Sequence, residues 1–257
     1  EPRFFDPGTP GCPSGLLSWE KEGVPALVYD RESPEFITTP LSAASCNVAA
    51  QMLTVSLLPD GRSEVKAVLE LGGQRALDIR SALKGRSPEG QRTILASKLG
   101  ESAPASAIDE SSIKVTGADS WEGQVKISYN FIAPLFAPPT EKWFLLRPAL
   151  LAHKDESLLT SPRRTNSVYF PYPWSEEDRI EIHLPDGFTP EQLPDDVNVN
   201  IGVGSYRSSY RQEKDRIVFA RNLTVNGFII APQQYQTLKS FFDRAHEGDR
   251  GVLFLKR

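Results

Sequence analysis

Apolar and polar residues alternate along much of this chain, and the alternation predicts a protein built largely of β-strands. In residues 64–71, apolar side chains occupy every odd position from 65 to 71, which is typical of a strand with one buried and one wet face. Pro-Asp-Gly turns at residues 59–61 and 185–187 interrupt the pattern and favour hairpins. Further strand-like runs occur at residues 47–58, 113–115, 125–132, 142–151, 167–172, 178–184, 197–203, 206–213, 216–225, 227–230 and 251–255.

Three segments show helical spacing instead. Apolar residues within 74–84 recur close to every third or fourth position. Ser87 and Pro88 form an N-cap and a first helical residue, and the helix that they open ends near Gly100. Residues 232–245 carry apolar side chains on one face and predict an amphipathic helix near the end of the chain.

Together these patterns predict the α+β class, predominantly β, with antiparallel β-sandwich-like lobes and a few short helices. We expect residues 41–137 to form a lobe of two strands, two helices and two strands. Residues 138–257 are expected to form an antiparallel sandwich-like lobe with a C-terminal helix. Whether the two lobes are separate domains stays open at this point.

Residues 1–40 differ from the rest, because proline and glycine interrupt them repeatedly and predict an irregular but ordered connector. Short apolar pieces within it could anchor the connector to a neighbouring surface. Its first residues look like the end of a buried strand that breaks into a tight turn. This pattern predicts that the sequence is a piece of a longer polypeptide.

Composition and charge exclude several classes of partner. The 257 residues include 29 basic and 33 acidic side chains, which are mixed along the chain and give a net charge of −4. No long run of one sign favours nucleic acid or an anionic membrane surface. No apolar stretch approaches the roughly 18 to 20 residues that a membrane-spanning helix needs.

Cysteines and motifs give no sign of a metal or cofactor. Cys12 and Cys46 could form one disulfide or remain two unpaired thiols, and neither has a second ligand at zinc spacing. No P-loop, dinucleotide fingerprint, zinc-protease motif or serine-hydrolase elbow occurs, so no cofactor is expected. The acidic clusters at residues 176–178 and 195–196 lack calcium-loop spacing and predict solvated turn charges.

Histidines and aromatic residues are the remaining candidates for chemistry or binding. His153, His183 and His246 have no nucleophile or orienting carboxylate in a recognisable pattern, so we expect surface histidines. The dense aromatic segment contributes four candidate binding residues, namely Tyr169, Phe170, Tyr172 and Trp174. An exposed strip of this kind would suit a sugar or a peptide, and the alternative is packing between sheets.

A set of short motifs resembles the C-terminal region of bacterial transglutaminase-like proteins of unknown function. In that family, a β-rich domain follows a transglutaminase-like core. The motifs that carry the resemblance are FDPGT at residues 5–9, GLLSW at 15–19, FITTP at 36–40, DG at 60–61, GGQRALDIR at 72–80, YFPY at 169–172, LPDG at 184–187, Arg221, Pro232 and YQTLKSFF at 235–242.

The resemblance implies that residues 1–40 are the exit strand and connector from a transglutaminase-like core. The family's core uses a Cys-His-Asp triad, in which histidine polarises the thiol and aspartate orients histidine. Asp6 falls where the triad aspartate would lie, whereas the expected Cys and His positions would precede it. Cys12 follows Asp6, so its order does not suit the nucleophile. We therefore expect this chain by itself not to be an enzyme.

These expectations define the function hypotheses. The leading one is a non-catalytic accessory region of a bacterial multidomain transglutaminase-like protein, whose partner is the transglutaminase-like domain of the same polypeptide. The resemblance implies an extracytoplasmic location, periplasmic or secreted. The second hypothesis is an independent carbohydrate- or protein-binding module, and the third is an enzyme in its own right.

Overall fold

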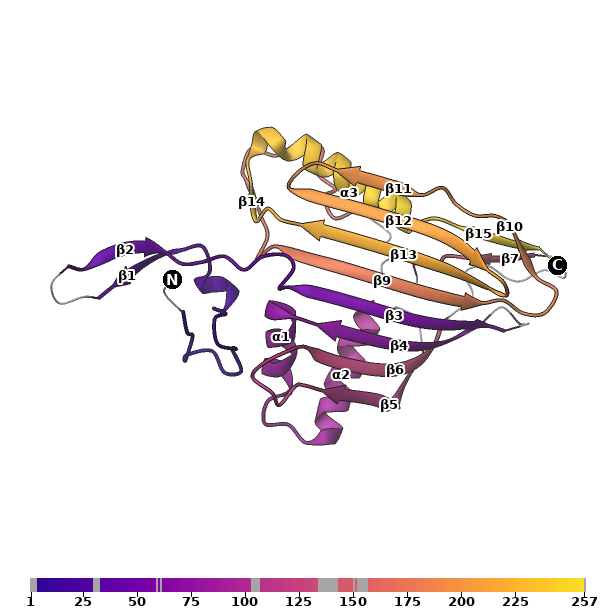
Figure 1. The fold of residues 1–257 in the computed structure, drawn as a ribbon, viewed down its shortest axis with the longest axis horizontal. Helices are drawn as coiled ribbons and strands as arrows, with labels where there is room; N and C mark the ends of the chain where they lie inside the picture. The colour runs from indigo at the N-terminus through magenta and orange to yellow at the C-terminus, as the bar shows by residue number, and fades with distance from the viewer. Residues whose placement is uncertain are drawn as a thin grey trace.

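An eight-stranded sheet forms the centre of the protein in the computed structural model, which describes residues 4–29, 33–58, 60, 62–102, 107–133, 143–149, 151 and 157–256 (Figure 1). Its strand order is β11-β12-β13-β9-β3-β4-β6-β5, and every neighbouring pair is antiparallel except β3–β9. The strands are β3 (Val48–Leu57), β4 (Ser63–Leu71), β5 (Ala107–Thr116), β6 (Val125–Ala133), β9 (Trp174–His183), β11 (Val197–Asn200), β12 (Gly204–Glu213) and β13 (Arg216–Val225).

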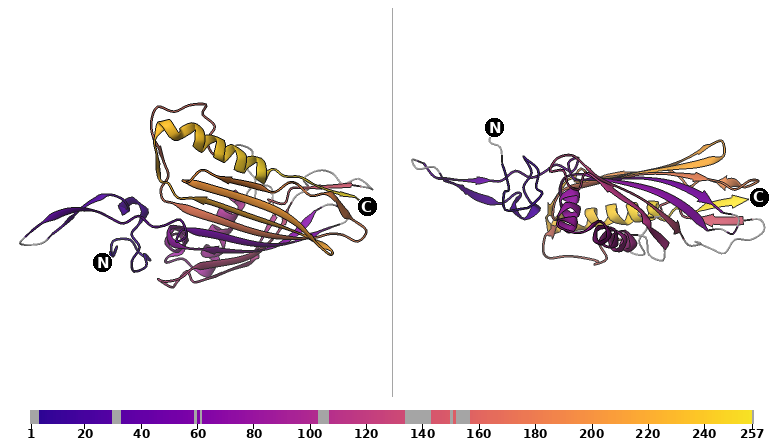
Figure 2. Two further views of the ribbon diagram at one scale, coloured as in Figure 1. Left: turned by 45° about the horizontal axis from the view of Figure 1, so that its top comes forward. Right: turned by 90° about the horizontal axis from the view of Figure 1, so that it is seen from below.

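Helices and a small second sheet cover one face of the large sheet and leave the other face open (Figure 2). The helices are α1 (Gly73–Leu83), α2 (Pro88–Ser102) and α3 (Tyr235–Asp249), with one-turn 3₁₀ helices η1 (Trp19–Lys21) and η2 (Pro232–Gln234). The small sheet joins β10 (Thr189–Gln192), β15 (Leu253–Lys256) and β7 (Trp143–Leu146), and β8 (Val168–Tyr169) pairs with β14 (Ile229–Ile230).

The core lies between the large sheet and these covering elements. Alternate residues of each strand face this side, and most of these residues are apolar. Leu53 and Val55 of β3, Ile182 of β9 and Phe219 of β13 are almost completely buried on the covered face. α3 adds the apolar stripe of Leu238, Phe241, Phe242 and Ala245 beneath β11 and β12. The predicted class, α+β and predominantly β, is confirmed.

The strands of the two predicted lobes hydrogen-bond into the same sheet. β3 from residues 41–137 pairs in parallel with β9 from residues 138–257 over nine residue pairs. Their buried side chains also contribute to a common apolar cluster, which includes Val55 and Ile182. The predicted division near residue 138 itself lies outside the described residues.

The N-terminal segment forms a hairpin, β1 (Pro25–Val28) with β2 (Glu35–Thr38), that projects away from the sheets (Figure 1). The prediction that proline and glycine keep this segment irregular is therefore wrong for residues 25–28 and 35–38. Pro25 is the first residue of β1, and Pro34 precedes β2, so neither removes a donor from the middle of the ladder. Residues 4–6 lie in no strand, and Phe5 is exposed.

Buried polar side chains fasten the base of this hairpin to the body. The Gln74 side-chain amide donates to the carbonyl of Leu17 at 2.7 Å and to Glu22 Oε1 at 3.0 Å. The Asn47 side chain accepts from the Gln74 backbone N–H at 3.0 Å and donates to the carbonyl of Pro173 at 2.8 Å. The start of α1 is thus the joint between the N-terminal segment and the large sheet.

Candidate functional site

Five charged side chains meet on the covered face of the large sheet, and we call them the Arg221 cluster: Arg75, Glu176, Asp178, Arg221 and Asp249. Arg221 is its centre, because it donates to Asp178 at 2.8 Å, to Asp249 at 2.7 Å and to Glu176 at 3.0 Å. Arg75 of α1 donates to the second oxygen of Glu176 at 3.1 Å. The cluster therefore joins β9, β13, α1 and α3.

Strand register brings the cluster together. Arg221 on β13 lies directly opposite Asp178 on β9, and Asp178 lies beside Gln51 on β3. Every second residue of a strand faces the same side, so the buried Ile180 and Ile182 place Asp178 and Glu176 on the covered face. Asp249, the last residue of α3, completes the cluster from the opposite layer.

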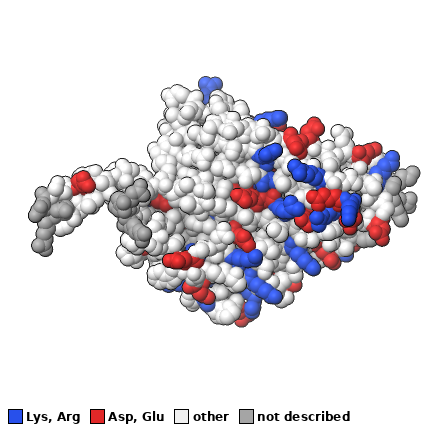
Figure 3. Space-filling model, viewed as in Figure 1, with Lys and Arg blue, Asp and Glu red and all other residues white. Residues whose placement is uncertain are grey.

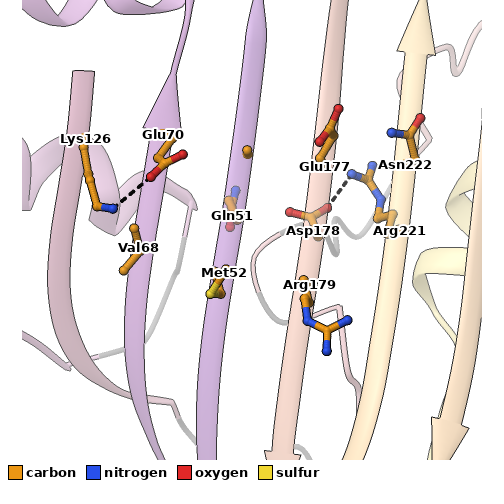
Figure 4. A pocket seen from close by; sticks show the side chains of 11 residues that line it. Gln51, Met52, Val68, Glu70, Lys126, Glu177, Asp178, Arg179, Arg221 and Asn222 are labelled. Atoms are coloured by element: carbon orange, nitrogen blue, oxygen red, sulfur yellow. Dashed lines mark hydrogen bonds and ion pairs between the residues drawn. The ribbon is translucent and has the colours of Figure 1, made fainter. Parts of the chain in front are cut away.

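A cavity of about 370 Å³ opens beside the cluster between the sheet and α3. All five residues of the Arg221 cluster line this cavity, together with Gln51, Trp174, Phe242 and His246. On the open face of the sheet, a shallow hollow of about 420 Å³ reaches Gln51, Asp178 and Arg221 from the other side (Figure 4). The centre of the cluster thus contacts both hollows.

The open face around that second hollow carries charges of both signs. Lys126 pairs with Glu70 at 2.9 Å across β6 and β4 (Figure 4). Charged side chains gather over the half of this face that lies away from the hairpin (Figure 3). Exposed pairs of this kind are worth little, about 0–1 kcal/mol each. They leave a mixed, solvated surface without a field of one sign.

Burial determines the ionisation of the cluster. It raises the pKa of Asp178 to about 6, although the nearby Arg221 guanidinium opposes the shift. Burial also raises the pKa of Asp249. Burial disfavours the charged form of Glu176 as well, but Arg221 and Arg75 outweigh it and lower the pKa of Glu176 overall. The three carboxylates raise the pKa of Arg221 against its own burial, so this guanidinium stays charged.

Chemically, this arrangement is suited to holding structure. Arg221 uses its donors on three carboxylates, and the Tyr206 hydroxyl donates to Asp249 at 2.8 Å. Within the described residues, no hydrogen bond joins the ring of His246 to a serine, cysteine or carboxylate, although His246 lines the cavity. The cluster fastens α3 to the sheet through the Arg221–Asp249 ion pair, whose two side chains are buried.

The raised pKa of Asp178 predicts an unusual pH dependence of stability. Folded Asp178 binds its proton more tightly than unfolded Asp178, so its contribution to the free energy of unfolding grows as pH falls from 7 to 5. We expect the free energy of unfolding of wild type minus that of Asp178→Asn to rise by about 1 kcal/mol over this range. Urea unfolding of both proteins at each pH measures this signed difference. Glu177→Gln, exposed on the opposite face, is the control, and a signed difference that stays constant or falls would contradict the prediction.

Asp6, the residue that matches the triad aspartate in the resemblance, is buried within the N-terminal segment. Its Oδ1 accepts from Lys21 Nζ at 2.5 Å, and its Oδ2 accepts from Thr9 Oγ1 at 2.7 Å and from the Ser18 N–H at 3.2 Å. Burial disfavours its charge, but these donors hold the pKa of Asp6 well below its usual range. Both oxygens therefore have partners within residues 6–21, and its role in a triad stays a prediction.

The four predicted binding aromatics do not share one exposed surface. Tyr169 is 69% exposed, whereas Tyr172 is half-buried. Phe170 packs edge-on against Trp174 with ring centroids 5.0 Å apart, and against Phe242 of α3 at 6.1 Å. Trp174 also lines the cavity beside the Arg221 cluster. Their role in ligand binding stays a prediction.

The remaining candidates are scattered. His183 is the last residue of β9, and His153 lies outside the described residues. Cys12 and Cys46 are both free thiols. Cys12 is buried and donates to the carbonyl of Leu16 at 3.2 Å, and its burial raises the pKa of the thiol. A buried thiol with a raised pKa is a poor nucleophile.

Sequence reasoning missed most of the Arg221 cluster. The segment 176–178 was expected to carry solvated turn charges, but Glu176 and Asp178 lie in β9 and Asp178 is buried. The signal was present, because extending the alternation of Ile180 and Ile182 backwards puts both carboxylates on the apolar face. Arg75 and Asp249 come from helices distant in sequence, and no pattern in the chain pairs them with β9.

Comparison with known families places a match in the second half of the chain. Residues 141–255 match the model of DUF3858, a domain of unknown function with a solved structure. The match includes the three carboxylates of the cluster and Arg221, and it excludes Arg75. No curated protein matches the sequence.

Among solved structures, one similar chain is a protein from Parabacteroides distasonis ATCC 8503 described as "a putative protease". The two are 14% identical with a TM-score of 0.39, and the similarity covers 46% of this chain and 24% of that one. The chain thus spans about a quarter of that protein. In the described part of this chain, no helix is long and apolar enough to cross a membrane.

Proposed function

We propose that this chain is a non-catalytic accessory region of a bacterial multidomain transglutaminase-like protein, and that it contacts the transglutaminase-like domain through its β1–β2 hairpin. The observation that carries the proposal is the projecting hairpin itself, whose side chains are apolar and exposed. Phe36 is 77% exposed and Tyr29, which follows β1, is 80% exposed. Leu27 and Val28 are exposed as well.

A two-stranded hairpin without a covering layer is marginally stable in water. This one has four residue pairs and no further strand beside it among the described residues. Exposed apolar patches on a soluble protein mark interaction sites. The hydrogen bonds of Gln74 with Leu17 and Glu22 hold the hairpin base on the body, so a partner that binds the hairpin would be fixed relative to the large sheet.

The buried chemistry supports a non-catalytic role. The carboxylate oxygens of Asp6 accept hydrogen bonds from Lys21, Thr9 and Ser18. Cys12 is a buried thiol with a raised pKa. The charged groups of the Arg221 cluster pair with one another, and the Arg221–Asp249 pair links α3 to the sheet. An extracytoplasmic location, periplasmic or secreted, is part of the proposal and rests on the resemblance alone.

Binding between this chain and the separately produced transglutaminase-like domain, measured by calorimetry, tests the proposal. We expect Phe36→Glu to weaken association at least tenfold, because it places a charge in an apolar contact. Met52→Glu is the matched control, since Met52 is an exposed apolar residue on the open sheet face. Unchanged binding by Phe36→Glu would reject the hairpin as the contact. Hydrolysis or cross-linking of a peptide amide by this chain alone would reject the non-catalytic role.

A further inference from the structure

Among the described residues, β11 is an edge strand, and no strand pairs with its outer side. It is the terminal strand of the large sheet among the described residues. The Ile201 N–H donates to the Gly204 carbonyl at 2.9 Å, so this residue pair points toward β12. Antiparallel pairs alternate, and the register therefore turns the backbone N–H and C=O of Asn198 and Asn200 away from β12.

An open groove lies next to this edge, between β11 and α3. It has a volume of about 400 Å³. Val199 and Ile201 form the strand side of the groove, and Phe241 contributes an aromatic ring from α3. The rest of its lining consists of Gln236, Thr237, Ser240 and Arg244, which recur along α3 at helical spacing. The groove is thus apolar near the strand and polar along the exposed side of the helix.

β5 forms the opposite edge of the large sheet, and it has features that discourage the addition of a further strand, which β11 lacks. The pairing of β5 with β6 is irregular between Asp109 and Lys114, and the Asp109 side chain accepts from the N–H and the hydroxyl of Ser111. Bulges and self-bonded acidic turns discourage a further strand from adding to an edge. β11 pairs with β12 in unbroken register, so its outer side can accept one.

We propose that the groove between β11 and α3 binds an extended peptide segment of a partner protein, which adds to β11 as a further strand. Main-chain bonds to Asn198 and Asn200 would hold the peptide, and alternate apolar side chains would enter the groove against Val199 and Ile201. Arg244 is the charged residue of the groove lining among described residues, and it favours a carboxylate at one end of the peptide. The ion pair of Arg244 with Glu247 is exposed and weak, so a peptide carboxylate can replace Glu247 as the partner of Arg244.

This site is separate from the hairpin and does not depend on its role. The probe is a fluorescent seven-residue peptide in which valine alternates with threonine and the last residue is glutamate. Its control has the same composition with the valines consecutive. We expect the alternating peptide to bind at least tenfold more tightly by anisotropy, and to protect the amides of β11 from hydrogen exchange.

Two variant pairs locate the binding. Asn198→Pro removes an outward N–H without taking a bond from the β11–β12 ladder, and we expect it to weaken binding at least tenfold. Asn198→Ala keeps that N–H and should bind like wild type. Arg244→Glu should weaken the glutamate-ended peptide and strengthen a lysine-ended one. Circular dichroism confirms that each variant is folded.

The proposal is overturned if neither peptide binds, if both bind equally, or if folded Asn198→Pro binds as tightly as Asn198→Ala. A dimer in light scattering that Asn198→Pro converts to a monomer would also overturn it, because a second copy of β11 would then be the natural occupant of this edge.

Discussion

Arg221→Met is expected to lower the free energy of unfolding by about 3–5 kcal/mol, the cost of removing one partner from a buried ion-pair network. Arg221 is 6% exposed, and its loss leaves Asp178, Asp249 and Glu176 without their shared cation. Methionine fills much of the same volume, so the effect reports the lost charge more than a cavity. Urea unfolding at pH 7 measures it.

The matched control is Arg179→Met on the neighbouring strand. Arg179 pairs with Glu181 at 3.0 Å but is exposed on the open face, so we expect a change below about 1 kcal/mol. Hydrogen exchange adds a second readout. When the cluster is lost, we expect the amides of α3 to exchange faster, and those of the large sheet to stay protected. Replacing Asp178 and Asp249 by apolar residues in the Arg221→Met background should recover part of the stability. A loss below 1 kcal/mol for Arg221→Met would show that the cluster does not fasten α3.

Most of the strands and helices could be predicted from the chain, because each depends on a local period. The alternation in residues 64–71 and 125–132 corresponds to β4 and β6, and the helical spacing in 74–84 to α1. The parallel pairing of β3 with β9 could not be predicted, since it joins segments more than 120 residues apart. The hairpin β1–β2 could not be predicted from proline content, because Pro25 and Pro34 lie at strand ends, where proline is compatible with pairing.

The candidate site was less predictable than the fold for a physical reason. A buried charge is stable only beside its partners, and those partners come from β9, β13, α1 and α3. In sequence, Asp178 and Arg221 look like ordinary surface charges. Only the register of two strands and the end of α3 make them a cluster, and no local pattern contains that register.

Gly73 is the first residue of α1, at the joint between the N-terminal segment and the large sheet, and Gly73→Ala is expected to lower the free energy of unfolding by about 3 kcal/mol. Gly73 has a φ of 53°, a left-handed conformation that costs an L-residue roughly 1–2 kcal/mol. An added Cβ would also lie 2.6 Å from the Cys46 carbonyl oxygen and would collide with the Asn47 side chain. Asn47 is fully buried and hydrogen-bonded, so it cannot move aside without loss, and overpacking of this kind costs about 1–3 kcal/mol.

Gly85→Ala separates the cost of backbone strain from the cost of the steric collision. Gly85 has a φ of 71°, but a Cβ there would meet no atom within 4 Å, so only the backbone strain of about 1–2 kcal/mol is expected. Thermal and urea unfolding give the difference between the variants, which measures the collision with Cys46 and Asn47. Equal losses of unfolding free energy in the two variants would mean that Cys46 and Asn47 move to accommodate the added methyl group without further cost. A larger loss at Gly73, accompanied by faster hydrogen exchange in the β1–β2 hairpin, would show that the start of α1 holds the proposed contact element in place.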